Sequence, residues 1–439
     1  MIRHSSLGMS DDRAIPATDE PLRRDARAVS GCLRRQITVI RDQWQPVVLP
    51  GLALWGLAMV VAGAVVHSFD LSEYERYAHQ ALQTPLFHRF PNEYPAPALA
   101  IFLLPVLLPL AYPWAFAIPV GVAILALLLS YGTSGVRGLD ANGARRLIVY
   151  LALGAVMVLT ARYDIFAAAA AFWSFRAARQ GRWSAAWTWS SVGFLLKLFP
   201  GALWPVLLIG EWSASGRVPF RRLWWMLGSL TVIAGLPMFL DPGATTNVLH
   251  YYLHRPTEIG SLPAALSLLA DGHGWHLSMS YHSLNVLTPL ASSISLVFEI
   301  AGLVACAAIW WAYARARIPM EAACLATLTV VVLGNKVFSV QYLMWLMPFW
   351  ALYRFRVSWI LASVANMAVF PYSIVAMSLG LGSARGYAAA LAMIYLTRDV
   401  LIVIGTCSWL RHLPKQWHNH RVHDPSRSKE RVRSHESAR

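Results

Sequence analysis

The sequence predicts an all-α polytopic membrane protein, a bundle of about twelve transmembrane helices with one short re-entrant or interfacial helix. Two observations lead to this prediction. The 439 residues are 57% hydrophobic and 13% charged, whereas roughly a quarter of the residues of a soluble domain are charged. Long uncharged runs recur between residues 46 and 410, and several reach the roughly 20 residues that cross a bilayer as a helix. A membrane β-barrel would show short segments of alternating polarity instead.

The formal net charge is +15, from 37 lysines and arginines against 22 acids. In a soluble protein this excess would indicate nucleic-acid binding. Here many basic residues lie in short loops and tails between apolar runs, as the positive-inside rule describes. We therefore expect membrane lipids, and no nucleic acid, as partners. The four cysteines form no CxxC pair, which argues against a metal site or a disulfide framework.

Both ends of the chain are predicted to be cytoplasmic tails around one transmembrane domain, residues 46–410. Residues 1–45 are polar, basic and too long for a signal-peptide n-region, so we expect a flexible tail. Residues 411–439 are predicted to form a second basic tail, which is disordered. Its five histidines could bind a metal, but a solvated basic tail facing anionic lipid is the preferred interpretation.

The first span is predicted from about residue 45 to residue 66. An arginine-rich stretch precedes it, which places the N-terminus inside and the loop 67–112 outside. Prolines interrupt the next apolar segment. Residues 97–111 are therefore predicted to form a short outer-leaflet or re-entrant helix, and residues 113–131 the true span. Such a broken helix is tolerated where it lines a cavity of the protein.

The remaining spans alternate in direction, with arginine-rich turns inside and a second long outer loop at residues 241–285. They are residues 147–160, 164–178, 185–197, 201–212, 223–240, 286–314, 321–334, 341–353, 357–372 and 387–409. This topology predicts a multi-pass protein of the plasma (inner) membrane with both termini in the cytoplasm.

A set of polar residues collects at the predicted outer ends of the spans. They are Asp70, Glu93, Arg162, Asp164, Lys197, His254, Arg255, Glu258, His282, Lys336 and Gln341. Lys197 and Lys336 are unusual because positive charge is disfavoured on this side. Each lysine could simply extend its ammonium group to the outer interface. Together with Arg162 and Arg255, the two lysines favour an anion-binding site.

The acids of the first outer loop lie in FDLSEYERYAHQALQTPLFHRFPNEYP, residues 69–95, and have competing explanations. Asp70 could cap the helix that starts at LSEYERYAHQAL, with Glu73 completing a capping box. Capping does not explain Glu93 in PNEYP, whereas Glu73 and Glu75 are expected on a solvated helix surface. The aromatic residues of the loop suit an interfacial belt or stacking on a sugar ring.

Five stretches, in order, resemble the GT-C superfamily of membrane glycosyltransferases, and more narrowly glycosyltransferase family 87 and its polyprenol-phosphate-mannose-dependent relatives. The stretches are DLSEYERYA followed by EYP, ARYDIFAAAAAFWSFRAARQGRWSAAW, GFLLKLFPGALWPVLL, YYLHRPTEIGSLPAAL and NKVFSVQYLMWLMP. The matching family elements read R-Y-D, G-L-x-x-x-x-K-x-x-P, R-x-x-x-x-x-S-x-P-A and V-F-S-P-Q-Y-L-x-W-x-x-P. The resemblance covers residues 50 to 410 approximately.

The resemblance implies transfer of a hexosyl group, mannosyl by analogy with the mannosyltransferases of the family, from a polyprenyl-phosphate donor to an envelope lipid or glycan acceptor. The reaction would take place on the outer side of the membrane, with inversion at the anomeric carbon and without a further cofactor or metal. Asp70 matches the first-loop aspartate that serves the family as general base. Glu93 could hold sugar hydroxyls or help to position Asp70.

The remaining candidate residues divide into two groups. Lys197, Arg255 and Lys336 are expected to stabilise the departing phosphate. Residues expected to bind substrate or brace the site are Tyr94, Arg162, Asp164, His254, His282 and Gln341. Within this second group, Arg162 and Asp164 could instead pair with each other.

Three positions depart from the family pattern, because the chain has EYPAP where E-Y-P-P is common, SVQY where S-P-Q-Y is common, and Gly260 where the outer-loop segment often carries Glu. The chief alternative function is a multi-span secondary transporter or lipid flippase, which would place charges near mid-membrane on paired broken helices. A catalytically silent scaffold is a third alternative. Sugar transfer by an Asp70→Ala protein would separate all three.

Overall fold

The computed structural model describes residues 44–65, 69–83, 90–91, 93–132, 140–240, 242–271, 276–378 and 385–421. These residues are mostly helical, with one small three-stranded sheet. Four helical segments are long and apolar enough to cross a membrane: Tyr112–Tyr131, Phe220–Leu240, Pro289–Ala314 and Tyr387–His412. Among the described residues only these four meet both requirements, so the count of about twelve crossings stays a prediction.

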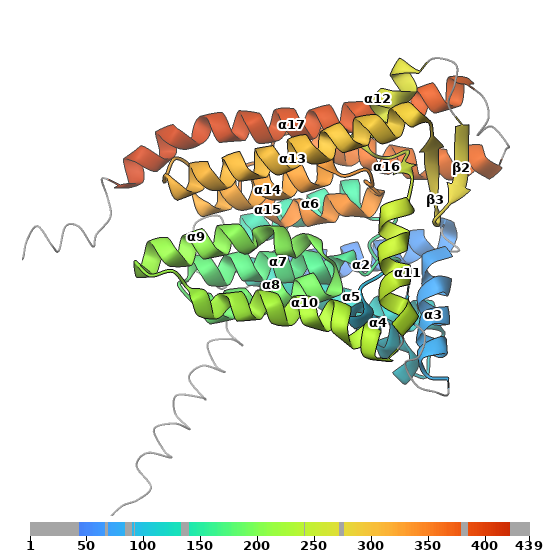
Figure 1. Ribbon diagram of the computed structural model, residues 1–439, viewed down its shortest axis with the longest axis horizontal. Helices are drawn as coiled ribbons and strands as arrows, with labels where there is room; N and C mark the ends of the chain where they lie inside the picture. Colours follow the sequence, from blue (N-terminus) through green and yellow to red (C-terminus); the bar gives the residue numbers. More distant parts are fainter. Residues whose placement is uncertain are drawn as a thin grey trace, which may run out of the picture.

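The body of the molecule is a bundle whose helices lie roughly side by side (Figure 1). Its helices are α2 (Leu49–Val65), α5 (Tyr112–Gly132), α6 (Ala141–Gly154), α7 (Asp164–Arg179), α8 (Trp183–Leu196), α9 (Trp204–Ser215), α10 (Phe220–Leu240), α13 (Pro289–Ala314), α14 (Met320–Gly334), α16 (Val357–Ser378) and α17 (Arg385–Arg421). The short turn η1 (Trp44–Val48) precedes α2. Short turns η4 (Phe199–Leu203), η5 (Val340–Trp345) and α15 (Met347–Trp350) join some of them.

Helix α7 forms the centre of the bundle because its small side chains permit close packing. The run Ala167–Ala171 is buried, and α8 lies against it, with Ala170 directly facing Gly193. A side chain larger than alanine at these contacts would push the helices apart. The first residue of α7, Asp164, is thereby fixed at one end of the packed core.

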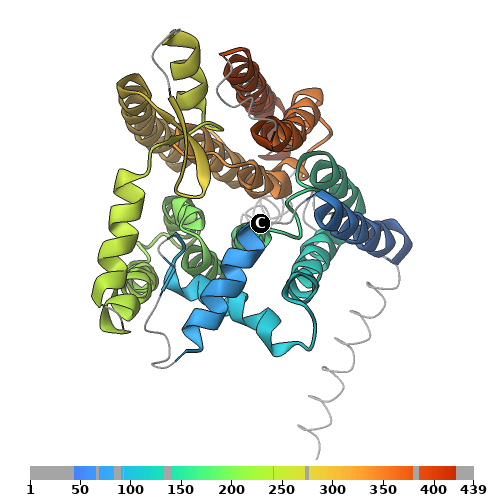
Figure 2. The same cartoon turned by 90° about the vertical axis from the view of Figure 1, so that its right-hand side faces the viewer.

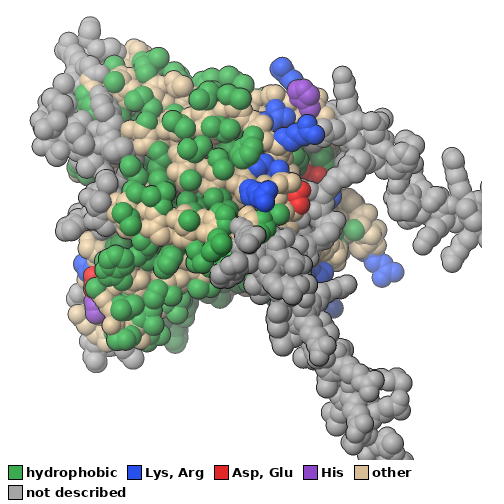
Figure 3. Space-filling view, turned by 180° about the vertical axis from the view of Figure 1, so that it is seen from behind, with side chains coloured by type: hydrophobic (Ala, Val, Ile, Leu, Met, Phe, Trp, Pro, Cys, Tyr) green, Lys and Arg blue, Asp and Glu red, His purple; other side chains and the backbone are tan. Residues whose placement is uncertain are grey.

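The outward face of α13 is apolar, although it is exposed in the isolated chain. Leu296, Val297, Ile300, Leu303 and Val304 are all more than half exposed and recur at the spacing of one helix face. Soluble monomers rarely expose a continuous apolar stripe of this kind. Figure 3 shows hydrophobic side chains spread over the opposite side of the molecule as well, with lysines and arginines gathered toward one end. This surface suits contact with lipid chains.

The two stretches predicted as outer loops come together at one end of the bundle (Figure 1). They form α3 (Phe69–Ala81), α11 (Pro242–His254), α12 (Leu262–Ala270) and the strands β1 (Thr257–Glu258), β2 (His276–Ser280) and β3 (Ser283–Leu287). Helix α3 lies across this end of the bundle (Figure 2). The candidate residues of both loops therefore meet in one region.

The proline-rich stretch before α5 is broken, as predicted. It consists of η2 (Ala96–Ala98), α4 (Leu99–Leu103) and η3 (Leu104–Leu107). The chain is extended at Leu108 before α5 begins, because the residue before a proline, here Pro109, is disfavoured in helical conformation.

The sheet was not predicted. Its order is β1-β3-β2, all antiparallel, and Ser280 pairs with Ser283 across a two-residue turn. Both turn residues, Tyr281 and His282, have positive φ angles of 54° and 55°. Such turns normally carry Asn-Gly or Asp-Gly, and non-glycine residues held in this region cost roughly 1 kcal/mol or more each. The sequence Tyr-His therefore gave no hairpin signal.

Helix α17 continues past residue 409, where the last span was predicted to end, as far as Arg421. The first part of the predicted disordered tail is therefore helical. The predicted N-terminal tail up to residue 43 and the stretch from residue 422 onward lie outside the described residues.

Candidate active site

Asp70 lies in the first turn of α3, where its negative charge is favoured by the helix dipole. The helix begins at Phe69, so Asp70 is already helical rather than preceding the helix as the capping explanation required. Its Oδ1 accepts a hydrogen bond from Arg162 Nη1, and both side chains are largely buried. Arg162 belongs to the connection between α6 and α7, so this ion pair ties the first outer loop to the core.

Asp164 opens α7 and is fully buried. Its Oδ1 accepts hydrogen bonds from Lys197 Nζ at 2.7 Å and from Trp345 Nε1 at 2.9 Å. Its Oδ2 is buried without a hydrogen-bond partner among the described residues. Arg162 and Asp164 thus bind different partners, and the suggestion that they pair with each other is wrong. Arg162 precedes α7, whereas Asp164 is its first residue.

The ammonium group of Lys197 is enclosed by aromatic rings. Nζ lies 5.0 Å from the ring centres of Tyr163 and Tyr342 and 5.4 Å from that of Trp345. Lys197 follows the end of α8 in extended conformation, which directs the side chain inward. Cation–π contacts and the bond to Asp164 stabilise the buried charge. Lys197 therefore does not extend to the membrane interface.

The carboxyl group of Asp70 is electrostatically perturbed. Burial raises its pKa above the usual range of an aspartate, and the neighbouring Arg162 guanidinium opposes that rise. The charges of Asp164 and Lys197 also act on it, so the four groups form one cluster, hereafter the central charge cluster. A carboxylate with a raised pKa is a stronger base once ionised.

Glu93 connects the first loop to the hairpin and to α11. Its Oε1 lies 3.0 Å from His282 Nε2 and accepts a hydrogen bond of 3.3 Å from the hydroxyl of Tyr77. The hydroxyl of Tyr252 donates to its backbone carbonyl at 3.0 Å. Burial raises the pKa of Glu93, against the effect of the neighbouring His282.

Tyr94 belongs to an aromatic group beside the central charge cluster. Its ring meets those of Tyr74, Phe102 and Tyr163 edge-on, at centroid distances of 5.6, 5.5 and 5.4 Å. These geometries are favourable. The aromatic residues of the loop therefore pack against one another beside the site. Their stacking on a sugar ring stays a prediction.

Three side chains near the hairpin are close enough together to hold a metal ion. Glu73, Glu93 and His282 each offer one ligand atom within 4.8 Å of the others, and these residue types are ordinary zinc ligands. Glu73, however, is engaged by Arg76, whose Nε lies 3.1 Å from its Oε2. A cation would have to displace that guanidinium, so the absence of a metal remains a prediction.

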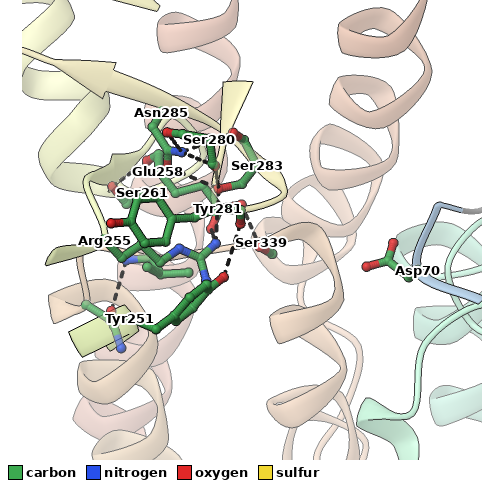
Figure 4. Close-up of polar contacts among 12 residues, drawn as sticks. Asp70, Tyr251, Arg255, Glu258, Ser261, Ser280, Tyr281, Ser283, Asn285 and Ser339 are labelled. Carbon is green, nitrogen blue, oxygen red and sulfur yellow. Dashed lines mark hydrogen bonds and ion pairs between the residues drawn. The ribbon is translucent and has the colours of Figure 1, made fainter. Parts of the chain in front are cut away.

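A second polar network surrounds Arg255 at the same end of the molecule (Figure 4). Its Nη2 lies 3.4 Å from Glu258 Oε2 and 3.1 Å from Ser283 Oγ. The hydroxyl of Ser339 donates to the other oxygen of Glu258. In Figure 4 Asp70 stands apart from this network, and its carboxylate points toward that side.

Arg255 also lines a pocket of about 480 Å³, together with His254 and Lys336. The ammonium of Lys336 lies 3.4 Å from the carbonyl oxygen of Leu253, a weak contact that leaves the ammonium able to bind an anion. His254 stacks on His250, with ring centres 4.0 Å apart. The three cationic or titratable side chains give this pocket a positive character, which Glu299 on its wall reduces.

Gln341 is buried in η5, and its Oε1 has no hydrogen-bond partner among the described residues. It lies next to Tyr342, whose ring covers Lys197. The structure thus brings it close to the central charge cluster without giving it a role there.

Sequence reasoning missed a buried pair in the last helix. Arg398 and Asp399 are fully buried and their Nε and Oδ1 atoms lie 2.8 Å apart. Arg398 also donates to Asn366 Oδ1 at 3.0 Å and to the carbonyl of Gly260, and its guanidinium covers the ring of Phe338 at 3.6 Å. The sequence does carry a signal for this pair, because two charged residues inside an apolar run are unusual in a membrane span.

Gly260 is required by its surroundings. A Cβ atom at this position would lie 2.5 Å from the carbonyl oxygen of Phe338. The glycine that departs from the family pattern is therefore the residue that lets the loop carrying Arg255 and Glu258 approach Phe338, just before η5.

Comparison of the chain with protein-family models and with curated protein sequences finds no match. The functional interpretation consequently rests on the site itself. That site offers a buried carboxylate of raised pKa at Asp70, an enclosed lysine–aspartate pair, and a separate cationic pocket at Arg255 and Lys336. Such a combination can accept a proton at one point and hold an anion at another.

Proposed function

We propose that the chain is a membrane glycosyltransferase of the GT-C type, similar to glycosyltransferase family 87. It would move a hexosyl group, mannosyl in the favoured case, from a polyprenyl phosphate to a lipid or glycan acceptor. The observation that carries the proposal is Asp70, a largely buried carboxylate with a raised pKa on a helix that crosses the end of the bundle. Its position in DLSEYERYA matches the base of the family.

In the proposed reaction the acceptor hydroxyl oxygen attacks the anomeric carbon of the donor. The bond from that carbon to the phosphate oxygen breaks, and the polyprenyl phosphate leaves with the electron pair. The hydroxyl proton passes to Asp70. Attack opposite the leaving group inverts the anomeric centre. Because phosphate is a good leaving group, no general acid is needed.

Arg255 and Lys336 are the proposed ligands of the donor phosphate. Both line the pocket of about 480 Å³, and Arg255 is already oriented by Glu258 and Ser283. An oriented guanidinium can bind phosphate through two parallel hydrogen bonds. Lys197 is reassigned in this proposal, because its ammonium is engaged by Asp164 and positions that carboxylate instead.

The proposed topology is a multi-pass protein of the inner membrane, with both termini in the cytoplasm and the Asp70 end outside. The clustering of both predicted outer loops at one end of the bundle supports it (Figure 1). The apolar outward face of α13 supports contact with lipid.

The test is sugar transfer by the purified full-length chain in nanodiscs, with a radiolabelled polyprenyl-phosphate hexose and a membrane-lipid extract as acceptor. Asp70→Asn should abolish transfer while the protein stays folded, and Glu75→Gln on the same helix is the matched control. A transporter or flippase would move the lipid-linked sugar across a vesicle membrane without forming a new glycoside. Absence of any glycoside product from the wild-type chain with either a mannosyl or a glucosyl donor would refute the proposal.

A further inference from the structure

A second pocket, of about 310 Å³, lies at the other end of α7. Asp164 opens the helix, and Arg176 follows 12 residues later, which corresponds to about 18 Å along a helix axis. The pocket is lined by Ala126, Leu129 and Ser130 of α5, Trp173 and Arg176 of α7, and Arg182 and Trp189 at α8. It is therefore separate from the candidate active site.

The polar part of this pocket is cationic. Arg176 and Arg182 both line it, and none of the described lining residues is acidic. Two guanidinium groups brought together repel each other, and an anion between them would remove that repulsion. The planar guanidinium is suited to paired hydrogen bonds with phosphate oxygens.

The aromatic part of the pocket indicates a membrane interface. The rings of Trp173 and Trp189 meet edge-on, with centroids 4.7 Å apart, and Trp189 is 38% exposed. Tryptophan concentrates where lipid headgroups meet lipid chains. Two tryptophans beside two arginines therefore match both the polar and the apolar portion of one lipid molecule.

Apolar side chains continue from the pocket along two helices. On α5, Val122 and Ile118 stand one and two turns before Ala126, and both are exposed. On α8, Val192 follows Trp189 by three residues and is also exposed. Spacings of three and four residues keep these side chains on the helix faces that border the pocket. They extend toward the Asp70 end of the bundle, as an acyl chain would.

We propose that this pocket binds one anionic phospholipid. Its phosphate would lie between Arg176 and Arg182, and one acyl chain would lie along Val122, Ile118 and Val192. The pocket is at the end of the bundle predicted to be cytoplasmic, so the lipid belongs to the inner leaflet. The site is independent of the proposed sugar transfer and concerns the anchoring of the bundle in the membrane.

The test measures lipid binding to the full-length chain in detergent by native mass spectrometry. The probes are phosphatidylglycerol, phosphatidylcholine with the same acyl chains, and inorganic phosphate. Phosphatidylglycerol should bind tightly and phosphatidylcholine weakly. Arg176→Gln/Arg182→Gln should weaken phosphatidylglycerol binding about tenfold, equivalent to about 1.4 kcal/mol. Arg221→Gln, which changes an exposed arginine of α10 outside the pocket, should leave it unchanged.

Equal binding of the two lipids, or unchanged binding by the double variant, would overturn the proposal. Displacement of phosphatidylglycerol by millimolar inorganic phosphate would also overturn it, since the site would then recognise free phosphate rather than a lipid. Arg176 is half-buried, so the double variant could fail to fold. In that case Arg182→Gln, at an exposed residue, decides: it should weaken phosphatidylglycerol binding about threefold, and wild-type binding would contradict the site.

Discussion

Lys197 and Asp164 form an ion pair of 2.7 Å inside the bundle, enclosed by aromatic rings. The two residues come from the end of α8 and the start of α7. Their separation in sequence concealed the pairing, and each had been assigned a separate role. The pair makes Lys197 primarily a partner of Asp164, with consequences for stability that can be measured.

The first prediction concerns this pair. Lys197→Ala should destabilise the protein by about 3–5 kcal/mol, because it leaves the Asp164 carboxylate buried without a counter-charge. Lys197→Met/Asp164→Asn should recover much of that loss. Thermal unfolding in detergent measures both, with Lys336→Ala as the control, since its ammonium makes only a weak contact. A wild-type melting temperature for Lys197→Ala would show that the pair contributes nothing.

The second prediction concerns the pH dependence of sugar transfer. Burial raises the pKa of Asp70 and Arg162 holds it down, and a general base must be ionised. Activity should therefore fall as the pH drops through a value above the usual range of aspartate, about 3.9. Arg162→Gln removes the lowering influence, so its acid limb should lie at higher pH. The check is a pH–rate profile of each protein, recorded where circular dichroism shows it folded. An acid limb that moves to lower pH in Arg162→Gln would contradict the assignment.

The third prediction concerns stability around Glu93. Its pKa is raised in the folded protein, so the folded state holds this proton more strongly than the unfolded state does. The free energy of unfolding should therefore fall as pH rises from about 4.3, the unperturbed value, through the folded pKa. Glu93→Gln should flatten this slope. Denaturant titrations of both proteins at several pH values measure the two slopes, and equal slopes would contradict the prediction.

The fourth prediction concerns Gly260. Gly260→Ala would place a methyl group against the carbonyl of Phe338, and overpacking of this kind costs about 1–3 kcal/mol. The matched control is Gly228→Ala in α10, where a Cβ atom meets nothing within 4 Å and the helix should gain about 0.5–1 kcal/mol. Opposite shifts in melting temperature are expected. Equal shifts would mean that the loop can move away from η5.

The fifth prediction concerns orientation in the membrane. In a chain whose native cysteines are replaced, Met279→Cys on β2 and Arg317→Cys after α13 lie at opposite ends of the bundle, and both side chains are exposed. An impermeant thiol reagent should label position 279 in intact cells. Position 317 should react only after the membrane is permeabilised. Labelling of 317 from outside would reverse the proposed topology.

The sequence predicted where the candidate residues gather better than it predicted what each one contacts. The alternation of arginine-rich loops along the chain predicted that Asp70, Arg162, Asp164 and Lys197 lie at the same end of the bundle. The structure brings these four residues together. Which ion pairs form depends on the directions in which the side chains leave the helix ends. For segments that are distant in the chain, the spacing of residues in the sequence does not reveal these directions.

Two other features lay beyond the sequence signals used. The hairpin was missed because Tyr281 and His282 are poor turn formers whose conformation is imposed by contacts, among them that of His282 with Glu93. Arg398 and Asp399 were missed because a long apolar run dominated the interpretation of the last span. Their burial depends on partners from α16 and from the loop at Gly260.

The hydrogen bonds that Arg398 donates to Gly260 and Asn366 have a consequence for biosynthesis. A ribosome makes the loop at Gly260 well before it makes α17, so until that helix is inserted the Gly260 carbonyl and the Asn366 side-chain oxygen lack this donor. A chain released early, without α17, would keep two polar groups unsatisfied in the bundle interior. The last helix to be synthesised therefore supplies the hydrogen-bond donor that completes the polar interior of the bundle.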